Sequence, residues 1–296
     1  MKRSFRVRPR KGPLQGAVQV PGDKSIGHRA LLFAALAEGP SRITGLSGGL
    51  DNRATAEALR AMGVSMTVGE REAAVEGVGL RGLRMASGPL DCGNSGTSMR
   101  LLAGLLAAQR FGSTLVGDAS LTGRPMRRIV DPLRARGAHI QGEKGKKEGE
   151  CYPPLRIAPL VEGELLLGFE YEMPVASAQV KSALLLSGLY AGAPTALSEP
   201  VLSRDHTERM MMALGVPLQT AGPVVRLDPA EWSGRWDGFE WHVPGDPSSA
   251  AFPLAAALAV GGSRVRVEGV CNNPTRTGFL EALRHMGALG EIVPKG

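Results

Sequence analysis

The sequence predicts an α/β protein built from repeated units, because four stretches of the chain follow one plan. Each stretch begins with a short polar loop, continues into a helix of small apolar residues, passes through a brief β-branched segment and ends in a second helix followed by Gly. The four stretches are residues 22–64, 93–138, 176–216 and 245–288. A period of roughly 40 residues is typical of repeated supersecondary units.

The polar loops predict helix N-termini that face anions. In the first stretch, Lys24 and Ser25 precede the apolar run around Leu31, a segment around Ile43 is strand-like, and the second helix ends near Gly63. The other three stretches repeat this order. Backbone N–H groups at a helix start are unpaired and lie at the positive end of the helix dipole, so several such starts directed at one place favour a ligand with several negative charges.

The length and composition favour two domains. The chain has 296 residues, of which 43% are hydrophobic and 4% aromatic, enough for a large core of Leu, Val and Ala. Residues 1–20, which include a strand-like segment, are expected to join residues 238–296 in an incomplete domain of about one unit. Residues 21–237 are expected to form a complete domain of three units.

Composition also excludes several classes of protein. The net charge of +7 is spread over every repeat, and three Tyr, three Trp and seven Phe offer few platforms for base stacking, so we expect no nucleic-acid partner. No apolar run is long enough to span a bilayer, and we expect no signal peptide after Met1, because no apolar stretch follows the basic start. Cys92, Cys151 and Cys271 lack metal-ligand spacing, so a cytoplasmic protein without a metal or cofactor is expected.

The first loop offers a cation, a cap and an arginine. Lys24 precedes the helix, Ser25 can cap it, and Arg29 follows Ser25 by four residues on the same helix face, so all three can reach one anion. An ordinary N-cap beside a surface arginine explains the same residues equally well. His28 is expected to be a packing or surface residue, because no second metal ligand lies at a suitable spacing.

The second loop combines glycines with hydroxyl groups. Gly93 and Gly96 lie where the backbone must approach a ligand closely, and Thr97 can donate from the first turn. The loop lacks the endings of the ATP and dinucleotide fingerprints, and an ordinary turn is the alternative. Downstream, Pro125 keeps Arg124 extended, so Arg124 is predicted to cover a cleft.

The third loop supplies Ser177 and Gln179 at a helix start, and Lys181 is interpreted as a surface residue. Arg204 begins the next helix, and its planar guanidinium matches the oxygens of a carboxylate or phosphate. Asp205 is an alternative partner that would hold Arg204 in place.

Six motifs in order resemble the EPSP synthases, the 3-phosphoshikimate 1-carboxyvinyltransferases. They are Val20-Pro21-Gly22-Asp23-Lys24-Ser25 with His28-Arg29-Ala30, Gly93-Asn94-Ser95-Gly96-Thr97, Gly123-Arg124-Pro125-Met126, Ser177-Ala178-Gln179-Val180-Lys181-Ser182, Ser203-Arg204-Asp205-His206-Thr207, and Val243-Pro244-Gly245-Asp246-Pro247-Ser248-Ser249. The form of the third motif and the segment from Asn273 to Gly278 resemble the second bacterial class, which is rich in glyphosate-tolerant enzymes.

The resemblance implies two domains of βαβαββ units, arranged as an inside-out α/β barrel of the enolpyruvyl transferase type. It implies transfer of the enolpyruvyl group of phosphoenolpyruvate to the 5-hydroxyl of shikimate 3-phosphate, through a tetrahedral intermediate that expels phosphate, with no cofactor. Shikimate 3-phosphate is expected at Lys24, Ser25, Arg29, Ser177, Ala178, Gln179 and Arg204. Phosphoenolpyruvate is expected at Lys24, Asn94, Gly96, Arg124 and Gln179, with Lys24 as the catalytic residue.

Two alternatives accompany this resemblance. The related UDP-N-acetylglucosamine carboxyvinyltransferases carry a reactive Cys where this chain has Ser120-Leu121-Thr122, and Asn where it has Ser25, so they fit less well. In EPSP synthases the acid–base carboxylates belong to a C-terminal part that no motif here matches; Asp51 and Asp246 are expected to be loop or cap residues. The chain is therefore also interpreted as a truncated, split or short form that binds shikimate 3-phosphate without turnover, with a C-terminal fragment as partner.

Overall fold

The computed structural model describes residues 12–145 and 147–290, and the contacts among them divide the chain into two units. The larger unit spans Gly22–Val243. The smaller unit combines the segment that ends at Pro21 with the segment that begins at Pro244. Part of the N-terminal segment that the sequence assigned to the smaller domain, residues 1–11, lies outside the described residues.

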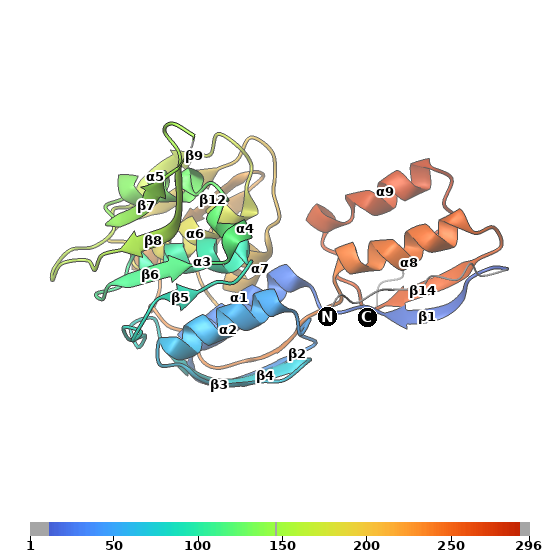
Figure 1. Ribbon diagram of the computed structural model, residues 1–296, viewed down its shortest axis with the longest axis horizontal. Helices are drawn as coiled ribbons and strands as arrows, with labels where there is room; N and C mark the ends of the chain where they lie inside the picture. Colours follow the sequence, from blue (N-terminus) through green and yellow to red (C-terminus); the bar gives the residue numbers. More distant parts are fainter. Residues whose placement is uncertain (1–11, 146, 291–296) are drawn as a thin grey trace. The chain divides into compact units, whose positions relative to one another are not determined.

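Within the described residues, the larger unit contains three four-stranded sheets, and the order of the strands follows the same plan in each. Figure 1 shows these sheets beside the helices of the larger unit. In each sheet the first two strands are parallel and the remaining neighbours are antiparallel. From one edge to the other, the first sheet contains β13 (Glu240–His242), β2 (Glu38–Thr44), β4 (Glu72–Val78) and β3 (Ser65–Val68). The second sheet contains β5 (Leu90–Asp91), β6 (Ser113–Val116), β8 (Cys151–Ile157) and β7 (Ile140–Lys144). The third sheet contains β9 (Phe169–Glu172), β10 (Thr195–Ser198), β12 (Val224–Leu227) and β11 (Leu218–Ala221).

The helices of the larger unit differ in burial: nearly every residue of the first helix of each repeat is buried, and a smaller share of the residues of the second helix. The first helix of each repeat is α1 (Lys24–Leu36), α3 (Gly96–Leu106) or α6 (Ala178–Gly188), and the second is α2 (Leu50–Ala61), α5 (Arg127–Ala135) or α7 (His206–Ala213). The described part of this unit also contains two short helices, α4 (Ala119–Thr122) and the 3-10 helix η1 (Pro229–Glu231). Helices α3 and α6 pack so closely that a Cβ atom on Gly104 would lie 2.2 Å from the carbonyl oxygen of Ala183. This packing brings two helix starts to one place.

The glycines that end the predicted repeats have a conformational cause. Gly63, Gly137, Gly215 and Gly287 each follow the second helix of a repeat, with φ of 92°, 96°, 79° and 93°. Glycine adopts this left-handed conformation without the steric cost that a Cβ atom adds, so it ends a helix efficiently. The ends of the second helices thus follow from local sequence.

The predicted domain boundary at residue 238 is wrong by six residues. Strand β13 pairs in parallel with β2, with Trp241 opposite Ile43, and Val243 N–H donates to the carbonyl of Thr44 at 2.8 Å. These hydrogen bonds place residues 238–243 in the larger unit, where β13 supplies the first strand of the first sheet. The sequence misses this because the two strands are far apart in the chain.

The smaller unit contains strand β1 (Gln15–Gln19), which pairs in parallel with β14 (Arg264–Glu268). Helix α8 (Pro247–Ala259) precedes β14, and η2 (Pro274–Arg276) and α9 (Gly278–His285) follow it. As predicted, Asp246 is a cap residue: its carboxylate accepts from the backbone N–H of Ser248 at 2.9 Å.

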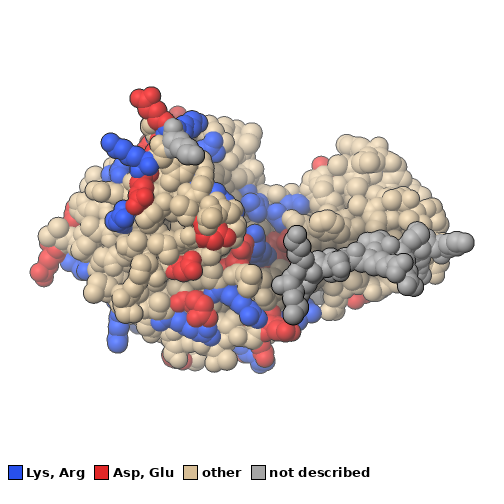
Figure 2. Space-filling model, in the orientation of Figure 1, with Lys and Arg blue, Asp and Glu red and all other residues tan. Residues whose placement is uncertain are grey.

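The described helices include none with the length and apolar character needed to cross a bilayer. Figure 2 shows Lys and Arg interspersed with Asp and Glu over the visible face of the larger unit. The positive charges therefore do not form one continuous stripe on that face.

Candidate functional site

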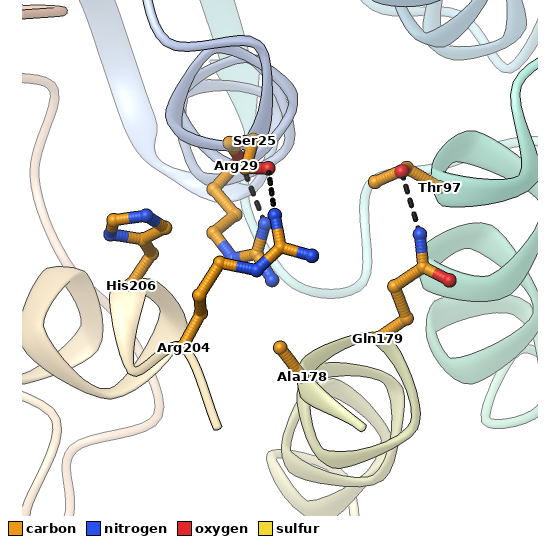
Figure 3. A pocket seen from close by; sticks show the side chains of 7 residues that line it. All are labelled: Ser25, Arg29, Thr97, Ala178, Gln179, Arg204 and His206. Carbon is orange, nitrogen blue, oxygen red and sulfur yellow. Dashed lines mark hydrogen bonds between the residues drawn. The ribbon is translucent and has the colours of Figure 1, made fainter. Parts of the chain in front are cut away.

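A recess in the larger unit collects the starts of several helices (Figure 3). Helix α1 contributes Ser25 and Arg29, α3 contributes Thr97, α6 contributes Ala178 and Gln179, and the start of α7 contributes Arg204 and His206. Two arginines and several hydroxyl and amide groups thus face one small volume.

The start of α1 is capped by Asp23, so the prediction that Ser25 caps the helix is wrong. The Asp23 carboxylate accepts from the backbone N–H of Ile26 at 3.0 Å. Because the cap position is filled, the Ser25 hydroxyl is turned to the recess, where it accepts from Arg204 Nη1 at 3.2 Å. This hydrogen bond links the first repeat to the third.

Arg29 is buried and held by three partners. Its Nε donates to Thr207 Oγ1 at 2.6 Å, its Nη2 to Ser182 Oγ at 2.6 Å, and its Nη1 to the carbonyl of Ser25 at 2.8 Å. Burial lowers the pKa of Arg29 to about 10, with Glu208 opposing the shift and Arg204 adding to it. The guanidinium is therefore charged at neutral pH and fixed in orientation, which lets it supply positive charge to the recess without reorganisation.

Lys24 lies outside the lining of the recess and pairs with a carboxylate. Its Nζ is 2.9 Å from Asp51 Oδ2, and its side chain is 51% exposed. Asp51 lies in the first turn of α2, whose N-cap is Gly49, so the expectation that Asp51 is a loop or cap residue is wrong. An exposed pair of this kind contributes little to stability, so Lys24 can exchange Asp51 for a ligand oxygen at small cost.

Gln179 connects the second and third repeats. Its Nε2 donates to Thr97 Oγ1 at 2.8 Å, and its Oε1 accepts from Arg100 Nη1 at 2.8 Å. Burial lowers the pKa of Arg100, and Arg124 and Arg128 add to that shift. Sequence reasoning missed Arg100, although its position four residues after Gly96 on the same face of α3 could have identified it.

The loop before α3 forms a separate polar corner. Arg124 Nη2 donates to Asn94 Oδ1, and Asn94 Nδ2 donates to Asp118 Oδ2 at 2.7 Å. The backbone N–H of Leu121 and the amide of Asn94 lower the pKa of Asp118. A Cβ atom on Gly96 would lie 2.8 Å from Arg100 Nη1 and 3.2 Å from Arg124 Nη1. Glycine at this position therefore leaves space for two guanidinium groups.

The interpretation of Lys181 as a surface residue is wrong. The Lys181 side chain is buried, and its Nζ lies 2.6 Å from Glu199 Oε2 and 2.6 Å from Glu208 Oε1. Burial raises the pKa of Glu208, while Lys181 opposes that shift. Ser177 is the N-cap of α6, and its hydroxyl accepts from Val180 N–H at 3.4 Å.

His28 is a core residue, the first of the two expected roles, packing or surface. It is fully buried, its Nδ1 lies 2.7 Å from Thr55 Oγ1, and burial lowers its pKa to about 3. Across the part of the chain that the structure describes, no group of His, Cys, Asp and Glu is arranged to hold a metal ion.

The structure brings half of the predicted site residues into the recess. Five of them line it: Ser25, Arg29, Ala178, Gln179 and Arg204. The others lie outside the lining: Lys24, Asn94, Gly96, Arg124 and Ser177. Thr97, noted in the second loop, and His206, two residues after Arg204, complete the lining. The contacts that hold these residues were not predicted, because they join repeats distant in sequence.

Fold and recess together define an α/β protein with a basic site formed at helix starts. A model of the family EPSP synthase (3-phosphoshikimate 1-carboxyvinyltransferase) matches residues 9–293. The chain belongs to this family.

Curated relatives and solved structures agree with this assignment. A 3-phosphoshikimate 1-carboxyvinyltransferase of Alkalilimnicola ehrlichii is 53% identical over 285 residues, which cover 96% of this chain and 61% of that protein. One of Citrifermentans bemidjiense is 48% identical over 292 residues, covering 98% of this chain and 65% of the relative. The structure of EPSP synthase from Acinetobacter baumannii matches with a TM-score of 0.84 at 46% identity, covering 94% of this chain and 61% of that one. This chain thus spans less than two thirds of the length of these proteins.

Proposed function

We propose that this chain binds shikimate 3-phosphate and phosphoenolpyruvate, and that it serves enolpyruvyl transfer between them with release of phosphate. The observation that carries the proposal is the recess, in which Arg29 and Arg204 lie beside the starts of α1, α3 and α6. Fixed guanidinium groups and helix N-termini both stabilise oxyanions. The names of the relatives supply the reaction.

The substrates are assigned to different parts of this site. Shikimate 3-phosphate is proposed at the recess and its rim, held by Lys24, Ser25, Arg29, Ser177, Ala178, Gln179 and Arg204. Phosphoenolpyruvate is proposed at the polar corner, held by Lys24, Asn94, Gly96, Arg124 and Gln179. The shared residues are Lys24 and Gln179, and Gln179 already bonds Thr97 of the second repeat.

Lys24 and Arg124 are assigned to the departing phosphate. Both side chains carry positive charge next to helix starts. Lys24 pairs with Asp51, and Arg124 donates to Asn94 and Ser120, so a phosphate oxygen can replace these polar partners. Positive groups directed at the place where charge develops lower the barrier of the chemical step.

The finer fold assignment is also a proposal. The three sheets of one strand order, each with its helices, support βαβαββ units arranged as in an inside-out α/β barrel. The smaller unit would then be an incomplete domain of the same kind, with a C-terminal fragment of the family as its partner.

Calorimetry with shikimate 3-phosphate and shikimate tests the proposed binding. Residues 1–296 should prefer the phosphorylated ligand, because most of the attraction is to the phosphate. The substitutions Lys24→Ala and Arg204→Ala should each weaken binding by about 1–3 kcal/mol, as expected for a charge-assisted hydrogen bond. Equal affinity for the two ligands would refute the assignment.

A second candidate function is binding without turnover. None of the described residues that line the recess is a carboxylic acid, and general acid–base groups contribute roughly 10²- to 10⁴-fold to rate. We expect residues 1–296 to release no phosphate from the two substrates. The part of the Alkalilimnicola ehrlichii relative that this chain does not span should restore release when added. Phosphate release by the purified chain, abolished by Lys24→Ala, would exclude this candidate.

A further inference from the structure

A buried acidic–basic cluster lies outside the lining of the recess and is not used by the proposed chemistry. The cluster consists of Lys181 on α6, Glu199 after β10 and Glu208 on α7, all less than a tenth exposed. Lys181 Nζ contacts a carboxylate oxygen of each glutamate at 2.6 Å. Burying three charges is costly unless each is paired, so the arrangement needs a reason beyond packing.

Glu199 differs from Glu208 in what else it holds. Its Oε1 accepts from the Ser203 hydroxyl at 2.5 Å and from the Ser177 backbone N–H at 3.3 Å. Its Oε2 accepts from the Ser203 backbone N–H at 3.1 Å as well as from Lys181. The Glu208 Oε2 atom, by contrast, has no hydrogen-bond partner among the described residues.

The two segments tied by Glu199 are those that carry ligand groups. Ser177 is the N-cap of α6 and directly precedes Ala178 and Gln179, and Ser203 directly precedes Arg204. The segment from Glu199 to Asp205 has neither helix nor strand structure, and Val201 and Leu202 within it are exposed. Such a segment depends on side-chain contacts for its conformation.

We propose that Glu199 is a positioning residue, which fixes the start of α6 and the Ser203–Arg204 segment in one geometry so that Ala178, Gln179 and Arg204 meet at the recess. Lys181 neutralises Glu199 and shares its charge with Glu208. This inference rests on the proposed function for the identity of the ligand, but the positioning itself is a property of the free chain.

The matched pair Glu199→Gln and Glu208→Gln tests the proposal. Both substitutions remove one buried negative charge, and both leave Lys181 with a single carboxylate. Only Glu199→Gln disturbs the acceptor shared by Ser177 and Ser203. Hydrogen–deuterium exchange of the ligand-free chain should therefore become faster at the amides of Ser177 and Ser203 in Glu199→Gln, and stay at the wild-type rate there in Glu208→Gln.

Ligand binding gives the second measurement. Glu199→Gln should lower the affinity for shikimate 3-phosphate by about tenfold or more, and Glu208→Gln should not lower it. This difference should hold even where the two variants melt at similar temperatures. If Glu199→Gln fails to fold, Ser203→Ala is the substitute, because it removes the hydrogen bond from the Ser203 hydroxyl to Glu199. Hydrogen exchange should then become faster at the amide of residue 203 and stay unchanged at the amide of Ser177. Unchanged exchange at Ser177 and Ser203 in the folded variant, or the same increase in Glu208→Gln, overturns the proposal. A wild-type chain that binds no shikimate 3-phosphate refutes the proposed function, while exchange still decides the positioning.

Discussion

Helices α1 and α8 begin in the same way but differ in burial. Each has thirteen residues and follows a Gly-Asp pair, and each aspartate caps its helix, Asp23 through Ile26 N–H and Asp246 through Ser248 N–H. In α1, eleven of the thirteen residues are buried, whereas in α8 only Pro247 and Ala250 are. The N-cap fixes where a helix starts; what covers the helix is decided by other parts of the fold.

The consequence is that each unit relies on different forces. In the larger unit, apolar side chains from three repeats bury one another, and charged residues such as Arg29 and Lys181 are enclosed with partners. In the smaller unit, described apolar side chains such as Phe252 and Met286 are 79% and 80% exposed. In the smaller unit, helix caps and the pairing of β1 with β14 therefore contribute more to the described structure than apolar burial does.

The largest effect that tests this comparison is the loss of a phenylalanine. Phe33 is 1% exposed, and its ring packs edge to face on Trp236 with 5.9 Å between the ring centroids. Phe33→Ala should therefore lower the free energy of unfolding of the larger unit by about 3–5 kcal/mol. Phe252→Ala on α8 should change the stability of the smaller unit by less than about 0.5 kcal/mol. Urea denaturation can follow the larger unit by tryptophan fluorescence, because Trp232, Trp236 and Trp241 all belong to it, and circular dichroism reports on both units. Equal losses would mean that α8 is covered in solution.

Burial of α1 should also make stability depend on pH. His28 has a pKa of about 3 in the folded chain against 6.5 for a solvent-exposed histidine, because burial disfavours its charged form. Between these values the unfolded chain binds a proton that the folded chain does not. Stability should therefore fall by about 1.4 kcal/mol per pH unit as the pH drops below 6.5.

The variant His28→Gln isolates this contribution. It should be less stable at pH 7, since it alters the contact with Thr55, but its unfolding free energy should change less between pH 6.5 and pH 4. His285→Gln, at the exposed end of α9, controls for the loss of an imidazole. Urea unfolding at a series of pH values measures this difference. If the unfolding free energies of wild type and His28→Gln changed in parallel with pH, the assignment to His28 would be wrong.

A third comparison uses glycines at helix starts. Gly96 begins α3, where a Cβ atom would meet Arg100 and Arg124. Gly278 begins α9, where a Cβ atom would have no atom of the described residues within 4 Å. Gly96→Ala should displace the two guanidinium groups and weaken the binding of glyphosate, an anion that we expect at the proposed phosphoenolpyruvate site, by about 1–2 kcal/mol. Gly278→Ala should leave that affinity unchanged. Calorimetry in which both variants bind glyphosate like the wild type would show that the guanidinium groups adjust without cost.

These contrasts show what local sequence predicts. The Gly-Asp and Ser-Ala-Gln segments identified helix starts, and the motifs identified the family, because caps and motifs are short-range patterns. The burial of Lys181 was not predictable in this way: its partners Glu199 and Glu208 are 18 and 27 residues away in sequence. The same holds for β13, whose partner β2 belongs to the first repeat. Pairing between distant segments decides which polar residues are enclosed.

The smallest expected effect is one that both units should share. Gly63 after α2 and Gly287 after α9 have φ of 92° and 93°. Among the described residues, a Cβ atom on Gly63 would make ordinary contacts, the nearest at 3.5 Å, and a Cβ atom on Gly287 would have no neighbour within 4 Å. The cost of Gly63→Ala and of Gly287→Ala is therefore the conformational cost of a left-handed alanine, about 1 kcal/mol in each case. Tryptophan fluorescence in urea can measure it for the larger unit, and hydrogen exchange of the α9 amides for the smaller one. Costs that agree within error would show that helix ends obey one local rule whatever covers the helix; a loss confined to Gly63→Ala would show that the end of α2 depends on the core around it.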